Sequence, residues 1–132
     1  MLFRSRGVEV HLILSKKMDQ LLVGLAQRSY YEELVEAGIH IHLYRDNFLY
    51  AKHLTFDDDI ALVGSTNIDI RSFRLNAEVA ILLYDRSVTE RLQKVQDGYF
   101  AHCERLSPDR WRRRRYLTRL THNLARLFSP LL

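Results

Sequence analysis

The chain has 132 residues, of which 47% are apolar and 27% are charged, with two prolines and five glycines. This length is typical of one domain with a hydrophobic core, and the composition excludes collagen-like, low-complexity and largely disordered proteins. The net charge is +4, and the single cysteine, Cys103, excludes an internal disulfide and favours a reducing compartment. The apolar runs are much shorter than the roughly 20 residues of a membrane-spanning helix, so the sequence predicts neither a membrane span nor a signal peptide.

The first third of the chain predicts a strand, a helix and a second strand. An apolar run at residues 8–14 is typical of a buried strand. Apolar residues then recur at helical spacing from residue 21 to residue 35, and the pattern stops at Ala37-Gly38. Residues 39–44 alternate and are rich in branched and aromatic side chains, as in a strand. This order predicts a parallel crossover unit.

The middle of the chain predicts a hairpin, a third strand and a second helix. Strands at residues 51–56 and 60–63, joined by a turn of three aspartates and ended by Gly64, read as a hairpin of two interior strands. A polar loop follows, then a strand at residues 78–84 and a helix over residues 87–102. The inward face of that helix is predicted to carry Val88, Leu92, Val95, Tyr99 and Phe100.

The last segment predicts a basic amphipathic helix that begins at Ser107-Pro108, with four leucines on one face, at positions 117, 120, 124 and 127. From Glu104 onward there are eight arginines and two carboxylates, a net charge of +6, which leaves −2 for the first 103 residues. This asymmetry favours an anionic partner for the C-terminal end. We therefore expect an α/β unit at residues 1–106 and a C-terminal helix at residues 107–132.

Polar side chains that suit phosphate chemistry lie at the ends of the predicted hairpin. Strand alternation places Tyr50 and Lys52 on one side, and a lysine among apolar neighbours calls for an anion. Gly64 allows close approach of the backbone, and the Ser65 hydroxyl and Asn67 amide can donate hydrogen bonds. These groups suggest a cradle for a phosphodiester; a solvated lysine beside an ordinary turn is the alternative.

The spacing resembles the extended motif of the phospholipase D superfamily, histidine-x-lysine-x4-aspartate-x6-glycine-serine-x-asparagine. Lys52, Asp57, Gly64-Ser65 and Asn67 match without a gap. Within that superfamily the chain is similar, nearly end to end, to the C-terminal half of bacterial cardiolipin synthases, through RGVEVHLIL, RSYYEELVEAGIHIHLY, FLYAKHLTFDDDIALVGSTNIDIRSFRLNAEV and the closing arginine-rich segment. The resemblance implies a phospholipase D-like half-domain, a mixed sheet flanked by helices.

The resemblance also implies a mechanism. One motif histidine attacks phosphorus and forms a phosphohistidine, and the other protonates the leaving alcohol and then activates the acceptor. Phosphatidylglycerol is both donor and acceptor, and the family needs no metal or cofactor because lysine and asparagine stabilise the phosphoryl charge. Here Lys52, Ser65 and Asn67 would bind phosphate, and Glu78 would orient an imidazole. Asp57 would be the catalytic aspartate of the motif, although a turn-forming role in its run of three aspartates is at least as well supported.

Tyr50 stands where the motif has its histidine, and the family's first motif copy and N-terminal membrane segments are missing from this sequence. A phenol has a pKa of about 10 against about 6.5 for an imidazole, so it is a poor proton shuttle near neutrality. We therefore expect a phosphatidyltransferase fragment that is inactive alone and needs an N-terminal half or a second copy as partner. The alternatives are a phosphate-binding or regulatory module without catalysis, and, ranked lower, a dimeric single-motif phosphodiesterase.

The arginine-rich end has three readings. Membrane contact ranks first, through Trp111 and the arginines Arg112, Arg113, Arg114 and Arg115. A solvated charged face ranks second, and nucleic-acid binding third. With the lipid-enzyme resemblance, this ranking predicts a peripheral location on the cytoplasmic face of the bacterial inner membrane.

Other reactive side chains carry weaker signals. His40 and His42 alternate on one strand but have no acidic or cysteine partner at metal-site spacing, so a strand surface or domain contact is predicted. His53 points to the opposite face from Lys52 by alternation. Cys103 lacks the neighbours of a catalytic nucleophile.

Overall fold

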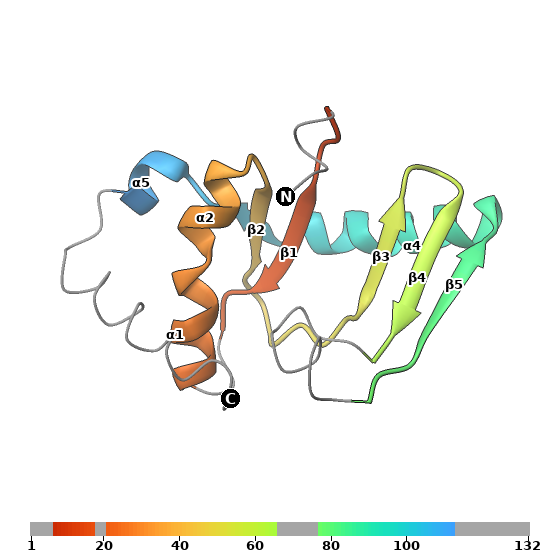
Figure 1. The fold of residues 1–132 in the computed structure, drawn as a ribbon, viewed down its shortest axis with the longest axis horizontal. Helices are drawn as coiled ribbons and strands as arrows, with labels where there is room; N and C mark the ends of the chain where they lie inside the picture. The colour runs from red at the N-terminus through yellow and green to blue at the C-terminus, as the bar shows by residue number, and fades with distance from the viewer. Residues whose placement is uncertain (1–6, 18–20, 66–76, 113–132) are drawn as a thin grey trace. The chain divides into compact units, whose positions relative to one another are not determined.

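The computed structural model describes residues 7–17, 21–65 and 77–112, which fall into two compact units (Figure 1). Unit 1 comprises Met1–Leu49 and His102–Leu132, and unit 2 comprises Tyr50–Ala101. The architecture is mixed α/β, with one three-stranded sheet in each unit. Within the described ranges, no helix has the length and apolar character needed to cross a bilayer.

Sheet A, in unit 1, is mixed. It consists of β1 (His11–Ser15), β2 (His40–Tyr44) and β6 (Cys103–Arg105) in the order β1-β2-β6. β1 and β2 are parallel, and β6 is antiparallel to β2. The segment between β1 and β2 forms α1 (Leu21–Ser29) and α2 (Tyr31–Glu36). The predicted parallel crossover is therefore confirmed, although its first strand begins at His11 rather than at residue 8.

The crossover contains two helices where the sequence predicted one. The helices are separated at Tyr30, whose N–H bonds the carbonyl of Gln27 at 3.2 Å, the tighter i to i−3 pattern. The end at Gly38 is as predicted. Gly38 has a φ of +83°, and its N–H and that of Ile39 bond the carbonyls of Val35 and Leu34, which is a Schellman cap.

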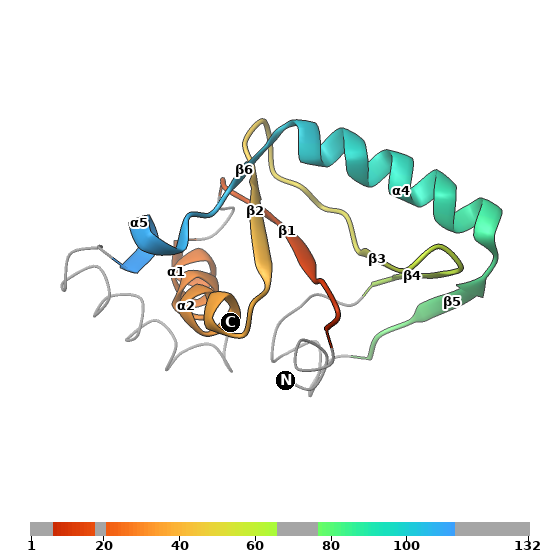
Figure 2. The same ribbon diagram turned by 90° about the horizontal axis from the view of Figure 1, so that it is seen from above.

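The core of unit 1 lies between sheet A and its helices, which gather on one side of the sheet (Figure 2). Ile41 of β2 and Tyr31 of α2 are 1% and 2% exposed. Trp111, on the short helix α5 (Pro108–Arg112), places its ring 5.2 Å from that of Tyr31. Burial raises the pKa of the Tyr31 phenol to about 12, so it stays protonated in its packed position.

Sheet B, in unit 2, is antiparallel and contains the predicted hairpin. β3 (His53–Phe56), β4 (Ile60–Gly64) and β5 (Ala80–Tyr84) lie in that order (Figure 1). β4 is the central strand and β3 lies at an edge, so only one of the two hairpin strands is interior to this sheet. The tight turn between them places Asp57 at a φ of +48°, a conformation that aspartate tolerates better than most residues.

Helix α4 (Arg86–Ala101) packs on one face of sheet B. The Asp85 carboxylate caps its N-terminus by accepting bonds from the N–H groups of Ser87 and Val88. Thr89 is fully buried, and Gln96 accepts a 3.0 Å hydrogen bond from Thr55 of β3. The prediction that Val95 faces inward is wrong, because the packed stripe is centred on these polar residues and leaves Val95 46% exposed.

The predicted C-terminal helix is described only as far as α5. Its four leucines and residues 113–115 lie outside the described residues, and the expected boundary at residue 106 stays a prediction.

Candidate active site

Four residues singled out by the family resemblance, Tyr50, Lys52, Ser65 and Glu78, gather within unit 2 beside the ends of β3, β4 and β5. The Lys52 ammonium donates to the carbonyl oxygen of Ser65 at 2.8 Å and to the Tyr50 hydroxyl at 3.1 Å. Its Nζ also lies 4.4 Å from the centre of the Tyr50 ring, within cation–π range. Lys52 is thus held by neutral oxygens and an aromatic face.

Strand pairing explains how residues so distant in sequence meet. Next to the His53–Val63 pair of the hairpin, the Gly64 N–H bonds the Lys52 carbonyl at 3.1 Å and carries the pairing beyond β3. On the other side of β4, the Ser65 N–H bonds the Val79 carbonyl at 2.9 Å. β4 therefore pairs on both sides, and these two antiparallel pairings bring the segments around Lys52, Ser65 and Val79 together.

Gly64 is the residue that makes this approach possible. A Cβ at this position would lie 2.7 Å from the Val79 carbonyl oxygen and 2.8 Å from the Cβ of Ala80. These distances are shorter than non-bonded contacts allow, so the close passage of β5 depends on the missing side chain.

The Ser65 hydroxyl links the strand end to the acidic residue. It donates to the Glu78 carboxylate and accepts a 3.0 Å bond from the Val79 N–H. A hydroxyl has one proton, and here that proton is directed to a carboxylate. In this arrangement Ser65 orients Glu78 and, through its carbonyl oxygen, Lys52.

The site is open to a ligand. The Tyr50 side chain is 73% exposed and Lys52 is partly exposed. Among the residues that the structure describes, no carboxylate forms an ion pair with Lys52. An uncompensated ammonium beside hydroxyl groups is suited to bind a phosphate oxygen.

The remaining motif residues lie elsewhere. Asp57 occupies the turn at the far end of the hairpin, where its carbonyl accepts a 2.8 Å bond from Gln93 of α4, so the structure does not bring it to Lys52. Asn67 lies outside the described residues. His53 turns toward α4, with its ring 6.2 Å from that of Tyr99, and burial lowers its pKa.

Sheet A carries a polar cluster that the sequence did not predict. His11 Nδ1 and His42 Nε2 are 3.0 Å apart, and Glu9 Oε1 lies 3.1 Å from His11 and 3.5 Å from His40. Arg105 Nη2 donates to His40 Nδ1 at 2.7 Å. Burial, and then the charges of His11, Arg105 and His40, lower the pKa of His42. The cluster depends on the parallel register that pairs His11 with His40, which no local sequence pattern indicates.

No group of three or more histidine, cysteine, aspartate or glutamate side chains within the described ranges could hold a metal ion. Cys103 is partly buried, and this burial raises the pKa of its thiol, so it stays in the weakly nucleophilic protonated form at neutral pH.

Comparison with known proteins gives the family. The model of the cardiolipin synthase PLD-like domain matches residues 3–99. Cardiolipin synthase A of Pectobacterium carotovorum is 38% identical over 128 residues, and that of Klebsiella pneumoniae is 39% identical over the same length. These alignments cover 97% of this chain and 26% of each relative, so the chain spans about a quarter of their length. No solved structure matches. The chain therefore belongs to the family of cardiolipin synthase PLD-like domains.

Proposed function

We propose that the chain supplies one half of a phosphatidyl-transfer site, of the kind that makes cardiolipin from two molecules of phosphatidylglycerol. The observation that carries this proposal is the convergence of Tyr50, Lys52, Ser65 and Glu78 within unit 2. The motif spacing and the family membership support the same chemistry.

In this half-site Lys52 binds a non-bridging oxygen of the phosphodiester and stabilises the charge that grows on it during transfer. Asn67 adds a second donor, and Ser65 holds both Lys52 and Glu78 in place. A histidine at position 50 would serve as proton donor to the leaving alcohol and as base for the acceptor. The transferred phosphatidyl group would rest on the histidine of the other motif, which a partner half provides.

Tyr50 changes what this half can do. Its hydroxyl accepts a 3.1 Å hydrogen bond from Lys52, which uses one of the three N–H donors of the ammonium and leaves Lys52 able to meet a phosphate oxygen. Near neutral pH a phenol is also a weaker proton donor and a weaker proton acceptor than an imidazole. We therefore infer that the chain alone binds a phosphate group but does not catalyse its transfer. In isolation it then acts as the phosphate-binding module named above as an alternative.

The place of action in this proposal is the surface of an anionic membrane, on the cytoplasmic face of the inner membrane of a bacterium. The substrate phosphatidylglycerol resides there, and the net charge of +6 after residue 103 favours that surface. The partner half-domain, from another chain or from a second copy, would complete the site.

The experiment is a titration of the full chain with dihexanoyl phosphatidylglycerol, followed by NMR shifts of the backbone amides of Gly64, Ser65 and Val79. We expect millimolar binding that weakens about tenfold in Lys52→Gln, because a charge-assisted hydrogen bond is lost. Lys94→Gln is the matched control, since Lys94 is an exposed lysine of α4 and its replacement removes the same charge. Equal weakening in both variants would leave only a general charge effect and refute the site.

A further inference from the structure

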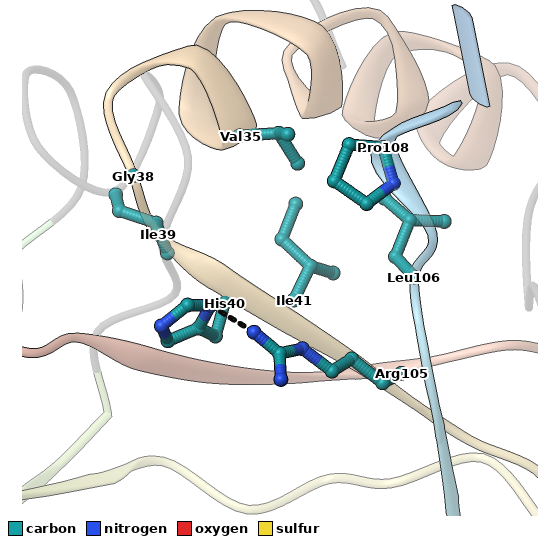
Figure 3. Close-up of a pocket in the computed structure, with 8 residues that line it drawn as sticks. All are labelled: Val35, Gly38, Ile39, His40, Ile41, Arg105, Leu106 and Pro108. Atoms are coloured by element: carbon teal, nitrogen blue, oxygen red, sulfur yellow. Dashed lines mark hydrogen bonds between the residues drawn. The ribbon is translucent and has the colours of Figure 1, made fainter. Parts of the chain in front are cut away.

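The face of sheet A opposite its helices carries a row of imidazole rings that connects all three strands. The register pairs His11 of β1 with His40 of β2, and His42 of β2 with Arg105 of β6. Paired residues of neighbouring strands share a face, so these four side chains lie on the same face of the sheet. Ile41, between the two histidines of β2, points to the buried face. Figure 3 shows His40 and Arg105 joined on one side of β2 and Ile41 on the other.

The side-chain link between β2 and β6 depends on one lone pair of His40. Arg105 Nη2 donates to His40 Nδ1 at 2.7 Å. A guanidinium can only donate, so Nδ1 carries no proton in this contact. The proton of the neutral ring is then on Nε2, which lies 3.5 Å from Glu9 Oε1. A proton from solvent and the Arg105 guanidinium therefore compete for the same nitrogen of His40.

The side-chain link between β1 and β2 is built in the same way. His11 Nε2 lies 3.1 Å from Glu9 Oε1, and His11 Nδ1 lies 3.0 Å from His42 Nε2. An ionised carboxylate can only accept, so Nε2 of His11 carries a proton, and Nδ1 of the neutral ring accepts from His42. One added proton is accommodated if this bond reverses and His11 donates to His42. A second added proton would set N–H against N–H and break the bond.

Two ion pairs of unit 1 lie outside this cluster. Lys16 pairs with Glu104 at 2.8 Å, and His102 pairs with Asp46 at 2.5 Å. Mild acid protonates imidazoles and leaves most carboxylates ionised. It therefore keeps the first pair and strengthens the second, whereas it removes the lone pairs on which the two imidazole links depend.

We propose that Glu9, His11, His40, His42 and Arg105 form a pH-sensitive clasp, which holds β1 and β6 against β2 at neutral pH and opens when its imidazoles take up protons. The links are present at high pH and are lost as the pH falls. β6 leads into α5 and the arginine-rich end, so an open clasp loosens the start of that segment. The clasp lies within unit 1, and the proposal is independent of phosphatidyl transfer.

The first test follows the ring nitrogens of the full chain by long-range ¹H–¹⁵N correlation NMR, which shows where each proton resides. At pH 7.5 we expect His11, His40 and His42 to carry a proton on Nε2 alone. Between pH 7.5 and pH 5, His11 and His42 should titrate together over a wider range than an independent group, because they share one added proton. His53 of unit 2 is the reference and should titrate as a single group. Independent curves for His11 and His42, or a proton on Nδ1 of His40 at pH 7.5, would overturn the proposal.

The second test measures how firmly β6 is held. The Leu106 N–H bonds the Ile41 carbonyl at 2.9 Å, and its hydrogen exchange is compared with that of an unstructured peptide at the same pH. Protection should fall about tenfold between pH 7.5 and pH 5, as expected for loss of a charge-assisted hydrogen bond. His40→Gln should abolish this fall, because a glutamine carbonyl accepts from Arg105 and does not titrate. His53→Gln, the matched control, should respond as the parent does.

Two results of the exchange measurement would contradict the clasp. Equal protection of Leu106 at both pH values in the parent chain would mean that proton uptake does not loosen β6. A His40→Gln variant with the same loss as the parent would remove the role of His40. The NMR titration of the parent chain needs no variant, so it decides the proposal even where His40→Gln does not fold.

Discussion

Lys52 is positioned by a carbonyl oxygen and a phenol, and this determines how its charge can be used. An ion pair with a carboxylate would have to be broken before the ammonium met a phosphate, whereas the bonds to Ser65 and Tyr50 leave the charge uncompensated. The bond to the Ser65 carbonyl at 2.8 Å fixes the direction of the side chain before a ligand arrives. Tyr50, the residue that differs from the motif, is therefore in contact with the lysine to which we assign phosphate binding.

Gly64→Ala tests the close passage of β5. The added Cβ meets the Val79 carbonyl at 2.7 Å, so we expect the free energy of unfolding to fall by about 1–3 kcal/mol, the usual range for overpacking. Urea denaturation followed by circular dichroism measures it. Gly98→Ala is the control, because a Cβ there meets nothing within 4 Å in the helix α4, and alanine should stabilise by up to about 1 kcal/mol. A Gly64→Ala protein as stable as the parent would show that β5 does not pass as closely.

His42 gives unit 1 a dependence on pH. Its pKa in the folded chain lies below the ordinary 6.5, so folding favours the neutral ring. The stabilisation is complete above pH 6.5 and is lost as the pH falls through the folded pKa. We expect an NMR titration of the His42 ring with a midpoint below 6.5, and a His42→Gln variant whose stability changes less between pH 7 and pH 5. A His42 midpoint above 6.5 would contradict the proposed cause, which is burial beside other cationic groups.

At the scale of elements, local patterns predicted the strands correctly where consecutive strands of the chain pair with each other. The crossover of β1 and β2 and the hairpin of β3 and β4 followed from alternation, helical spacing and the turn residues. Gly38 marked the end of α2 because a Schellman cap needs a residue that accepts positive φ.

Tertiary packing decided the features that the patterns missed. The division of the crossover at Tyr30 coincides with the burial of Tyr31 next to it, which no periodicity reveals. Val95 fits the apolar spacing of α4. The helix nevertheless packs on the sheet through Thr89, which is fully buried, and Gln96, which accepts a hydrogen bond from Thr55. Strand ends depend on pairing partners, and so β3 begins two residues later than its apolar pattern predicts.

The arginine-rich C-terminal segment is an element whose function the sequence predicts. If it contacts membranes, the full chain should bind vesicles that contain phosphatidylglycerol, and the affinity should fall with salt. Replacement of Arg113, Arg114 and Arg115 by glutamine should weaken binding about 100-fold, at about 1 kcal/mol for each arginine. Vesicle sedimentation measures this, with phosphatidylcholine vesicles as control. Equal binding to both vesicle types would rule out the electrostatic contribution.

For the whole molecule, the resemblance indicated candidate site residues, and strand register explains why four of the described ones lie together. Tyr50, Lys52, Ser65 and Glu78 meet because β4 pairs on both sides. The backbone bond from Val79 to Ser65 and the cluster around His11 and His42 depend on registers between distant strands, which a single sequence does not reveal.

The open face of sheet B predicts self-association. Strand alternation places Leu54, Phe56, Leu82 and Tyr84 on the face away from α4, and all four are exposed. Such an apolar face is typical of an interaction surface, so we expect oligomers at micromolar concentration by light scattering. Leu54→Thr with Leu82→Thr should increase the monomer fraction, while Val95→Thr on α4 should not. A parent chain that stays monomeric would contradict the half-domain interpretation.

The central claim, that this chain is a phosphatidyl-transfer half-site altered at Tyr50, is tested most directly by restoring the histidine in a complete enzyme. The chain is joined to the N-terminal part of a cardiolipin synthase A, and cardiolipin formed from phosphatidylglycerol is measured with Tyr50 and with Tyr50→His. A positioned proton-transfer group contributes about 10²–10⁴-fold, so the histidine chimera should be faster by that factor and should lose this activity with Lys52→Gln. Equal rates with tyrosine and histidine, or no activity in either chimera, would contradict the account.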